Sequence, residues 1–510
     1  MPTSWMTCDL KTLLTSLESG SRPKGGVRGI KEGIPSIGGE HLTYKGTLDF
    51  SSIKYVSNEF ASRMNKGHIQ KSDILIVKDG ATTGKTAFID EKFPYDNAVV
   101  NEHVFVCRPS PLVAAKFVFK YLMSKEGQER ILENFQGSAQ GGINLSFAPN
   151  TEVVLAPVNE QRRIVAKLEK LLQKVDACKE RLDKIPTILK RFRQSVLAAA
   201  CSGRLTEDWS EKNPEKPMVE LLDDLENARQ KLWLEDNRKR SNNKKRYRKA
   251  VKIDIGNKTK GINELFNLPL TWSWVSLGQT VWKTVDGPHY SPKYVSRGVG
   301  IPFISSRNVS YNGIDFSDAK YISKKDHNIF VKRAEPLFED VLLTKGGTTG
   351  IATVVSADMP FSIWVHVALL KVVENYVSPY YLRDVLSVPY VYKQSQAQTH
   401  GVGNQDLGLT RMIYFALPLP PINEQHEIVC RVEALFKIAD QIEERYKKAR
   451  SYVDKLTQSI LAKAFRGELV PQDPTDELAS ELLKRIKEEK AKTGTKAKTM
   501  KRGGRSKAQA

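Results

Sequence analysis

The chain has 510 residues, with 79 Lys and Arg against 58 Asp and Glu, and its formal net charge is +21. Its apolar content of 40% is ordinary for globular proteins, and its length allows several hydrophobic cores. No apolar run reaches the length of a membrane span, and the N-terminus lacks the basic and then apolar pattern of a secretion signal. The sequence therefore argues against a membrane or secreted protein.

The five cysteines are an odd number without any C-x-x-C pair. This pattern predicts reduced thiols in the cytoplasm and no zinc or other metal site.

The positive charge is concentrated in two segments. Residues 237–261 contain eleven Lys and Arg and one acid, and residues 484–510 contain eleven Lys and Arg and two acids. These segments hold 19 of the 21 net charges, so the rest of the chain is nearly neutral. We expect mobile basic arms that touch nucleic acid phosphates without reading sequence, or solvated tails that only keep the chain soluble.

Residues 1–156 are expected to form a strand-rich domain with some helix. Residues 73–78 are typical of a short buried strand, and they run into a glycine-bracketed turn at 80–84. Residues 114–136 have a helical pattern. A Gly/Gln/Ser-rich loop at 137–142 then precedes a short strand.

Residues 157–205 are expected to form a long helix of roughly 60 Å with one apolar stripe. Pro157 followed by Asn159 predicts the start, with the asparagine as N-cap. Gly203 predicts the stop. Pro186 removes a backbone donor and should kink the helix. Residues 206–262 then read as a charged amphipathic helix followed by the basic linker.

The second half of the chain repeats the first. Residues 263–419 predict a second strand-rich domain, and residues 420–469 a second long helix. The segments 157–205 and 421–469 align without a gap, and 19 of their 49 aligned pairs are identical. A repeat of this length indicates two large halves. Residues 470–510 read as a short helix and a disordered basic tail.

The predicted fold is α+β, with two strand-rich domains joined by a pair of long antiparallel helices and an internal pseudo-two-fold duplication. An isolated helix of this length with one apolar stripe needs a partner, and the repeated helix is the simplest one.

The whole pattern resembles the specificity (S) subunit of type I restriction–modification systems, and its closest likeness is to the enteric type IA branch. The first domain has only P-x-S-W at 2–5, where the family usually has L-P-x-G-W. The resemblance rests on two P-x-N-E-Q helix starts at 157–161 and 421–425, on I-P-T-I-L-K-R-F-R-Q at 185–194 leading to G-R-L-T-E-D-W at 203–209, and on L-T-Q-S-I-L-A-K-A-F-R-G-E-L at 456–469.

The resemblance implies a non-catalytic subunit whose two domains each read one half of a bipartite duplex DNA target. The helices would set the unread gap and dock two methyltransferase (M) subunits, and two motor-nuclease (R) subunits would complete the complex. The chain would then carry no cofactor, because S-adenosylmethionine, ATP and Mg²⁺ would bind the partners.

Sequence readout requires a stable framework with exchanged polar side chains at one spot. Residues 35–37 lead to Glu40 and His41, and the matching residues 302–304 lead to a different polar set. Arg pairs with guanine, Asn with adenine, and Glu accepts from the cytosine amino group, while hydroxyls and ammonium groups suit phosphates. A plain polar surface turn is the alternative. The candidate DNA-binding residues are Glu40, His41, Lys78, Thr82, Thr83, Lys85, Ser306, Arg307, Asn308, Lys345, Thr348 and Thr349.

Two other classes of function stay open. Residues 80–86 suggest a P-loop, but three residues separate the glycines where four are needed, and Ile351 stands where the repeat would need its lysine. A hidden P-loop enzyme or nuclease is therefore disfavoured. A scaffold whose helix pair bridges partner proteins is the second alternative.

Overall fold

The computed structural model describes residues 1–137, 141–239, 246–401 and 405–505, with side chains through residue 492. The chain forms two compact units. Unit 1 comprises Met1–Asp183 and Lys447–Ala510, and unit 2 comprises Lys184–Tyr446. Each unit therefore contains one strand-rich domain and parts of both long helices.

The domain of unit 1 is built on a four-stranded sheet in the order β2-β8-β5-β6 and a three-stranded sheet in the order β4-β3-β7. Strand β3 runs parallel to β7, and the short pair β1-β9 brings the two ends of the domain together. The elements are β1 (Met6–Asp9), α1 (Leu10–Leu13), β2 (Leu14–Ser19), β3 (Ile34–Ile37), η1 (Gly39–His41), β4 (Lys54–Val56), α2 (Asn58–Arg63), β5 (Ile74–Val77), β6 (Thr86–Phe88), β7 (Val99–Val100), β8 (Val104–Pro109), α3 (Ala115–Met123), α4 (Lys125–Leu132), α5 (Phe147–Asn150) and β9 (Glu152–Leu155).

The domain of unit 2 repeats this topology strand for strand, in the orders β11-β19-β16-β17, β15-β12-β18 and β10-β20, and adds the hairpin β13-β14. Its elements are β10 (Ser273–Ser276), α9 (Leu277–Thr280), β11 (Val281–Asp286), β12 (Ile301–Ile304), η2 (Ser306–Asn308), β13 (Val309–Ser310), β14 (Gly313–Ile314), β15 (Lys320–Ile322), α10 (Lys324–Phe330), β16 (Val341–Thr344), β17 (Ala352–Val354), β18 (Ser362–Ile363), β19 (Val367–Val372), α11 (Pro379–Leu386), α12 (Pro389–Gln398), α13 (Leu409–Met412) and β20 (Ala416–Leu419).

The strand predicted at 73–78 is present as β5, its counterpart in the second domain is β16, and every residue of both is buried. The helical pattern at 114–136 is divided into α3 and α4, because Ser124 takes an extended conformation and caps the second helix with its hydroxyl.

The long helices are α6 (Val158–Ala200) and α14 (Ile422–Phe465). The expected asparagine N-cap is wrong, because Asn159, like its counterpart Asn423, already lies inside the first turn. The predicted glycine stop is confirmed: Gly203 and its counterpart Gly467 both take φ of +79°, the left-handed conformation that favours glycine. Helix α6 continues through Pro186, and a kink there stays a prediction.

The Glu and Gln of the P-x-N-E-Q motif join each helix to its domain. In unit 1, buried Glu160 accepts a hydrogen bond from Trp5 Nε1 at 2.8 Å. The Gln161 side chain accepts from Ala114 N at 2.9 Å and donates to Ala156 O at 2.8 Å. These bonds satisfy buried polar groups where strand, helix and sheet meet.

Unit 2 repeats the same junction. Glu424 accepts from Trp272 Nε1 at 2.8 Å, and Gln425 accepts from Ser378 N at 2.8 Å. The repeated motif therefore acts as a fixed joint between each domain and the helix that follows it.

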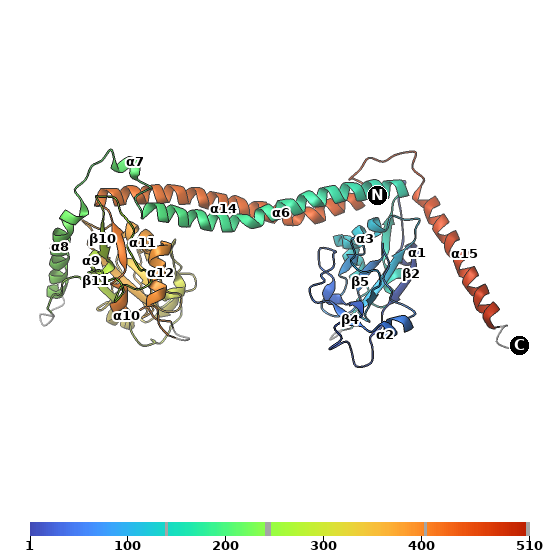
Figure 1. The fold of residues 1–510 in the computed structure, drawn as a ribbon, viewed down its shortest axis with the longest axis horizontal. Helices are drawn as coiled ribbons and strands as arrows, with labels where there is room; N and C mark the ends of the chain where they lie inside the picture. The colour runs from blue at the N-terminus through green and yellow to red at the C-terminus, as the bar shows by residue number, and fades with distance from the viewer. Residues whose placement is uncertain (138–140, 240–245, 402–404, 506–510) are drawn as a thin grey trace. The chain divides into compact units, whose positions relative to one another are not determined.

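Segments of α6 and α14 lie side by side and antiparallel within each unit (Figure 1). In unit 1, Arg450 contacts Asp183, and the Lys179 ammonium lies 4.0 Å from Asp454. In unit 2, Arg193 contacts Asp440 at 2.6 Å, and Arg431 contacts Asp208 at 2.6 Å. Partner numbers fall as α6 numbers rise, so the predicted antiparallel pairing is confirmed.

The repeat extends further than the sequence analysis recognised. Helix α8 (Met218–Lys239) begins with Met218 N donating to Thr271 O at 2.8 Å. Helix α15 (Ala479–Arg505) begins with Ala479 N donating to Ser4 O at 3.1 Å. Both helices therefore dock in the same way on the residue that lies two positions before the first strand of a domain. Helix α7 (Glu207–Ser210) lies between α6 and α8.

Both basic segments contain regular or packed structure where they are described. Helix α15 reaches Arg505, although the basic composition of the tail predicts disorder. The linker also packs where it is described. The Tyr247 ring lies 5.5 Å from that of Trp233, and Thr259 is buried against Tyr414 O. Residues 240–245 and 506–510 lie outside the described residues.

The main cores join domain and helices within each unit. In unit 1, Phe117 and Leu168 of α3 and α6 pack with Phe465 and Ile486 of α14 and α15. The core of unit 2 combines its sheet with parts of α6, α8 and α14 in the same manner. No helix among the described residues is long and apolar enough to span a bilayer.

Candidate nucleic-acid interface

In each domain, a buried strand ends in a single 3-10 turn that presents a charged side chain. Strand β3 leads into η1, where Glu40 is exposed, and β12 leads into η2, where Arg307 is exposed. The polar exchange predicted from the sequence therefore occurs on one backbone framework. Glu40 and Arg307 occupy the same place in the two turns.

The next residue of each turn has a structural position, and this corrects its expected place on the surface. Gly38 N donates to the ring nitrogen Nδ1 of buried His41 at 2.8 Å. In unit 2, Ser305 N donates to Oδ1 of buried Asn308 at 3.0 Å. When two neighbouring positions both differ between the repeats, the sequence alone cannot show which side chain is exposed for base contacts and which one caps the turn. Here the caps are His41 and Asn308.

In unit 1, the glycine turn after β5 lies beside η1. An added Cβ on Gly39 would stand 3.7 Å from Thr82 Oγ1. Thr83 Oγ1 donates to Gly80 O at 2.7 Å, and the Lys85 ammonium lies 4.5 Å from the centre of the Tyr44 ring. Lys78 is half-buried, with its ammonium 3.8 Å from Asp79. The structure thus brings all the candidates of unit 1 to one edge of the domain.

In unit 2, the matching turn approaches η2, since an added Cβ on Gly347 would stand 3.4 Å from Ser306 Oγ. Thr348 is exposed on this turn.

Two candidates of this turn, Lys345 and Thr349, are buried, and their expected phosphate contacts stay a prediction. The Lys345 ammonium lies 3.0 Å from Asp406 and 3.4 Å from Asp286, in a site where its side chain is 5% exposed. Thr349 is buried, and its hydroxyl lies 3.1 Å from that of Thr399. A buried ammonium needs compensating carboxylates. Asp286 and Asp406 are distant from Lys345 along the chain, and only the fold brings them close to its ammonium.

A third loop, which the sequence analysis missed, completes this edge. His103 follows β7 and its Nδ1 lies 2.6 Å from Asp79 Oδ1. His366 stands at the same place after β18, where burial lowers its pKa and the Lys345 charge adds to the effect. The sequence contained a signal for this loop, because both histidines directly precede a buried strand that begins with Val, β8 after His103 and β19 after His366.

The electrostatics of the two edges differ. In unit 1, burial would raise the pKa of Glu40, but the 2.5 Å hydrogen bond from Lys54 helps to hold that pKa below its ordinary value. In unit 2, the Arg307 guanidinium lies 3.7 Å from the exposed Asp318 carboxylate. Both ion pairs are solvent-exposed and weak, so either charged group can exchange its partner for a ligand.

Among the described residues, no group of three or more His, Cys, Asp and Glu side chains could hold a metal ion. The glycine turns are tight links between antiparallel strands, β5-β6 and β16-β17, and no helix follows them directly as a phosphate loop requires. The parts of the neighbouring glycine loops at 138–140 and 402–404 lie outside the described residues.

Fold and site together define a duplicated recognition protein, with the same loop edge built twice on paired helices. The family described as the type I restriction modification DNA specificity domain matches residues 2–187 and 269–449. The chain belongs to this family. It is therefore a DNA-specificity subunit, in which catalysis is the task of other chains.

Curated relatives extend the likeness over most of the chain. It is 33% identical to the EcoBI specificity subunit of Escherichia coli, covering 69% of this chain and 67% of that protein. It is 28% identical to the EcoDI specificity subunit of E. coli over 87% and 90%, and 25% identical to the EcoKI specificity subunit of E. coli K12 over 98% and 99%.

Solved structures show the same fold. The HsdS subunit from Thermoanaerobacter tengcongensis matches with a TM-score of 0.54 at 17% identity, over 92% of this chain and 98% of that one. A chain from a study of assembly and conformational transition in the type I R-M system matches with a TM-score of 0.61 at 18% identity, over 92% and 99%.

Proposed function

We propose that the chain selects a bipartite duplex DNA target, with each domain reading one half through the loop edge described above. The observation that supports this most is the exchange of Glu40 for Arg307 on matching 3-10 turns. Two unlike side chains on one framework would recognise two different base sequences. The half-sites are therefore expected to differ in sequence.

The exposed members of the edge would make the direct contacts. Arg307 would donate two hydrogen bonds to guanine, and Glu40 would accept from the cytosine amino group. Side chains on the glycine turns would bind phosphates and sugars, which fixes register without reading sequence. These side chains are Lys78, Thr82, Thr83, Lys85 and Thr348, and Ser306 on the neighbouring 3-10 turn would join them. The buried candidates His41, Asn308, Lys345 and Thr349 would hold the loops in place.

Replacing Arg307 with alanine tests this assignment. Relative binding to targets that differ at single positions should change at one base pair of one half-site, by about 1–3 kcal/mol. Arg204→Ala, which removes an exposed arginine beside the stop of α6, is the control and should leave every preference intact. An equal loss of affinity for all sequences would make Arg307 a phosphate contact and overturn its proposed role.

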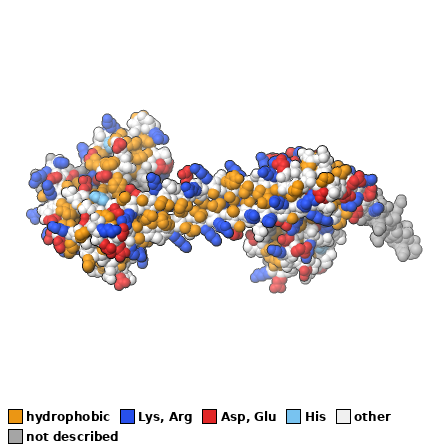
Figure 2. All heavy atoms as spheres, turned by 90° about the horizontal axis from the view of Figure 1, so that it is seen from above, with side chains coloured by type: hydrophobic (Ala, Val, Ile, Leu, Met, Phe, Trp, Pro, Cys, Tyr) orange, Lys and Arg blue, Asp and Glu red, His pale blue; other side chains and the backbone are white. Residues whose placement is uncertain are grey.

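A type I specificity subunit acts together with DNA and a methyltransferase. We propose that two M subunits bind the helix pair, and that two R subunits join them in a cytoplasmic complex. Hydrophobic side chains gather over the helices (Figure 2), and Ile188, Phe192, Ile438 and Ile442 of unit 2 are more than a third exposed. Exposed apolar patches of this kind mark protein interfaces.

The reaction chemistry would then lie outside this chain. S-adenosylmethionine, ATP and Mg²⁺ would bind the partner subunits, while this chain would supply position and sequence choice. We also propose that the domains, the long helices and the linker between them end at residues 156, 205, 262, 419 and 469.

A further inference from the structure

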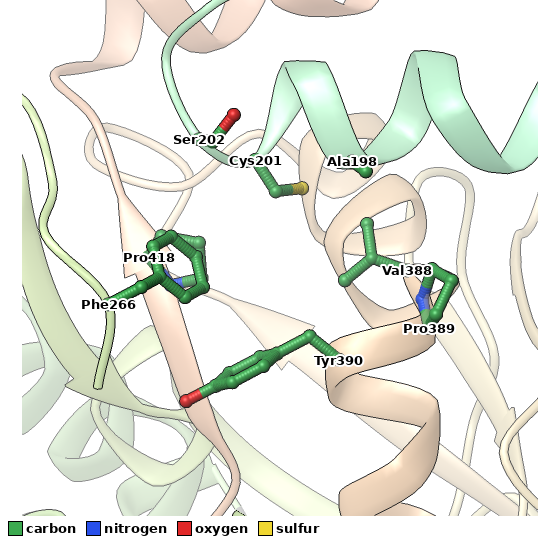
Figure 3. A pocket seen from close by; sticks show the side chains of 8 residues that line it. All are labelled: Ala198, Cys201, Ser202, Phe266, Val388, Pro389, Tyr390 and Pro418. Atoms are coloured by element: carbon green, nitrogen blue, oxygen red, sulfur yellow. The ribbon is translucent and has the colours of Figure 1, made fainter. Parts of the chain in front are cut away.

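Unit 2 contains an apolar pocket to which the proposed function assigns no role. The pocket has a volume of about 310 Å³ and lies at the end of α6 (Figure 3). Cys201 points into it, with Phe266 and Pro418 on one side and Val388 on the other. A cavity of roughly 150 Å³ already holds a benzene ring, so this pocket has room for an aromatic side chain.

The internal repeat shows what the same place holds in unit 1. Cys201 corresponds to Phe465, at the offset of 264 that relates the two long helices. Phe465 is 4% exposed, and its ring lies 5.3 Å from the rings of both Phe117 and Tyr121. In unit 1 the chain therefore fills this position with its own ring, and in unit 2 it places a small thiol there.

The rim of the pocket also differs between the units. In unit 2, Tyr390 stacks edge-on with Phe266 at a ring distance of 5.2 Å, and Trp274 lies 5.6 Å from Tyr390. At the position of Tyr390, unit 1 has the exposed Glu126. Unit 2 thus combines an empty place for a ring with an aromatic rim, and the rim of unit 1 is polar.

We propose that this pocket receives one aromatic side chain of the methyltransferase subunit that binds unit 2. The proposal rests on the proposed function, in which methyltransferase subunits dock on the helices. Burial of one ring in a fitted pocket is a common source of interface affinity. The asymmetry means that the two methyltransferase contacts differ in strength and that only one of them depends on this pocket.

The chemistry of the pocket argues for a protein side chain and against DNA. Its lining consists almost entirely of carbon and sulfur atoms, whereas a nucleic acid would need donors for its phosphates. The lining residues come from the end of α6 and the residues that follow it, from the segment before β10, from β20 and from the start of α12, and none of them belongs to the reading loops. A partner that contacts the repeated framework therefore suits the pocket better than one that contacts the variable loops.

Cys201→Phe tests the proposal, because it places in unit 2 the ring that unit 1 already has. The free subunit should gain about 2–4 °C in Tm, and binding of the methyltransferase to unit 2 should weaken roughly thirtyfold. Titration followed by native mass spectrometry measures this as loss of one bound subunit, with the other retained. Cys201→Ala leaves the pocket open and should bind like the wild type.

Pro389→Glu is a second variant that does not rely on packing a new ring. Pro389 is exposed on the rim and is the first residue of α12, where a carboxylate is tolerated. It should weaken the same association without lowering Tm. Unchanged methyltransferase binding by both variants would overturn the proposal, and so would a Cys201→Phe subunit with a lower Tm. A wild-type chain that binds no methyltransferase at all would instead contradict the proposed function.

Discussion

Removal of the Glu424 carboxylate is the sharpest test of how unit 2 is held together. Glu424 is 2% exposed and accepts hydrogen bonds from Trp272 Nε1 and Thr206 Oγ1, both at 2.8 Å. Glu424→Ala leaves two buried donors without an acceptor, at about 1–3 kcal/mol for each. We expect a total loss of about 2–6 kcal/mol in the free energy of unfolding of unit 2.

Hydrogen exchange read by mass spectrometry locates the effect. The β10-β20 pair next to Trp272 should lose protection in Glu424→Ala, while β1-β9 in unit 1 stays protected. Glu160→Ala breaks the matching bond to Trp5 and should show the reverse pattern. Glu424→Gln keeps one carbonyl acceptor, so it should cost about 1 kcal/mol. Two results would refute the claim that Glu424 fixes α14 to the domain of unit 2. One is an equal loss of unfolding free energy in Glu424→Ala and Glu424→Gln, and the other is an equal loss of protection in both units.

The same carboxyl group gives a pH dependence with a defined sign. Burial raises the pKa of Glu424 above its ordinary value of 4.5, even though the Thr206 and Trp272 hydrogen bonds oppose the shift. The folded state therefore holds this proton more tightly than the unfolded state. Its contribution to stability is full below pH 4.5 and is lost as the pH rises through the raised pKa. The wild type should thus lose unfolding free energy relative to Glu424→Gln over this window, as measured by denaturant titration at each pH.

Three further predictions concern the helix stop, the helix pair and the reading turn. Gly467→Ala should destabilise unit 1 by more than about 1 kcal/mol in denaturant unfolding, because φ is +79° and the new Cβ would lie 2.3 Å from Pro2 Cγ. An unchanged midpoint would contradict that contact. Arg450→Ala should cost less than about 1 kcal/mol, and 1 M salt should remove the difference, because its ion pair with Asp183 is partly exposed; a large loss that resists salt would argue against this. Asn308→Ala should reduce discrimination at one half-site in DNA-binding assays without abolishing folding, because it releases the 3-10 turn from its cap; intact discrimination would show that the cap is dispensable.

The sequence predicted the large features of the fold because they depend on long patterns. The two long helices, their antiparallel pairing and their glycine stops followed from one apolar stripe written twice. The docking of α15 was missed, although the triplet Glu-Leu-Leu occurs at 220–222 in α8 and again at 481–483 in α15. A search for the repeat beyond the long helices would have found it.

The candidate interface was predictable only in part. Adjacent polar residues on a tight turn point in different directions, so the sequence could not separate exposed Arg307 from buried Asn308. The burial of Lys345 depends on Asp286 and Asp406, which lie far from it in the sequence and near it only in the folded domain. Such contacts require the fold before the role of the residue can be assigned.

The most direct test of the two-domain account is the pattern of modified bases that the chain directs. The chain is expressed with its methyltransferase subunit in a host that lacks such a system, and the methylated sequence is read from the genome. We expect two short, unlike words separated by a fixed gap. Exchanging residues 1–156 for the first domain of a relative should change one word and leave the other word and the gap intact. A single contiguous target, or a change in both words, would contradict the account.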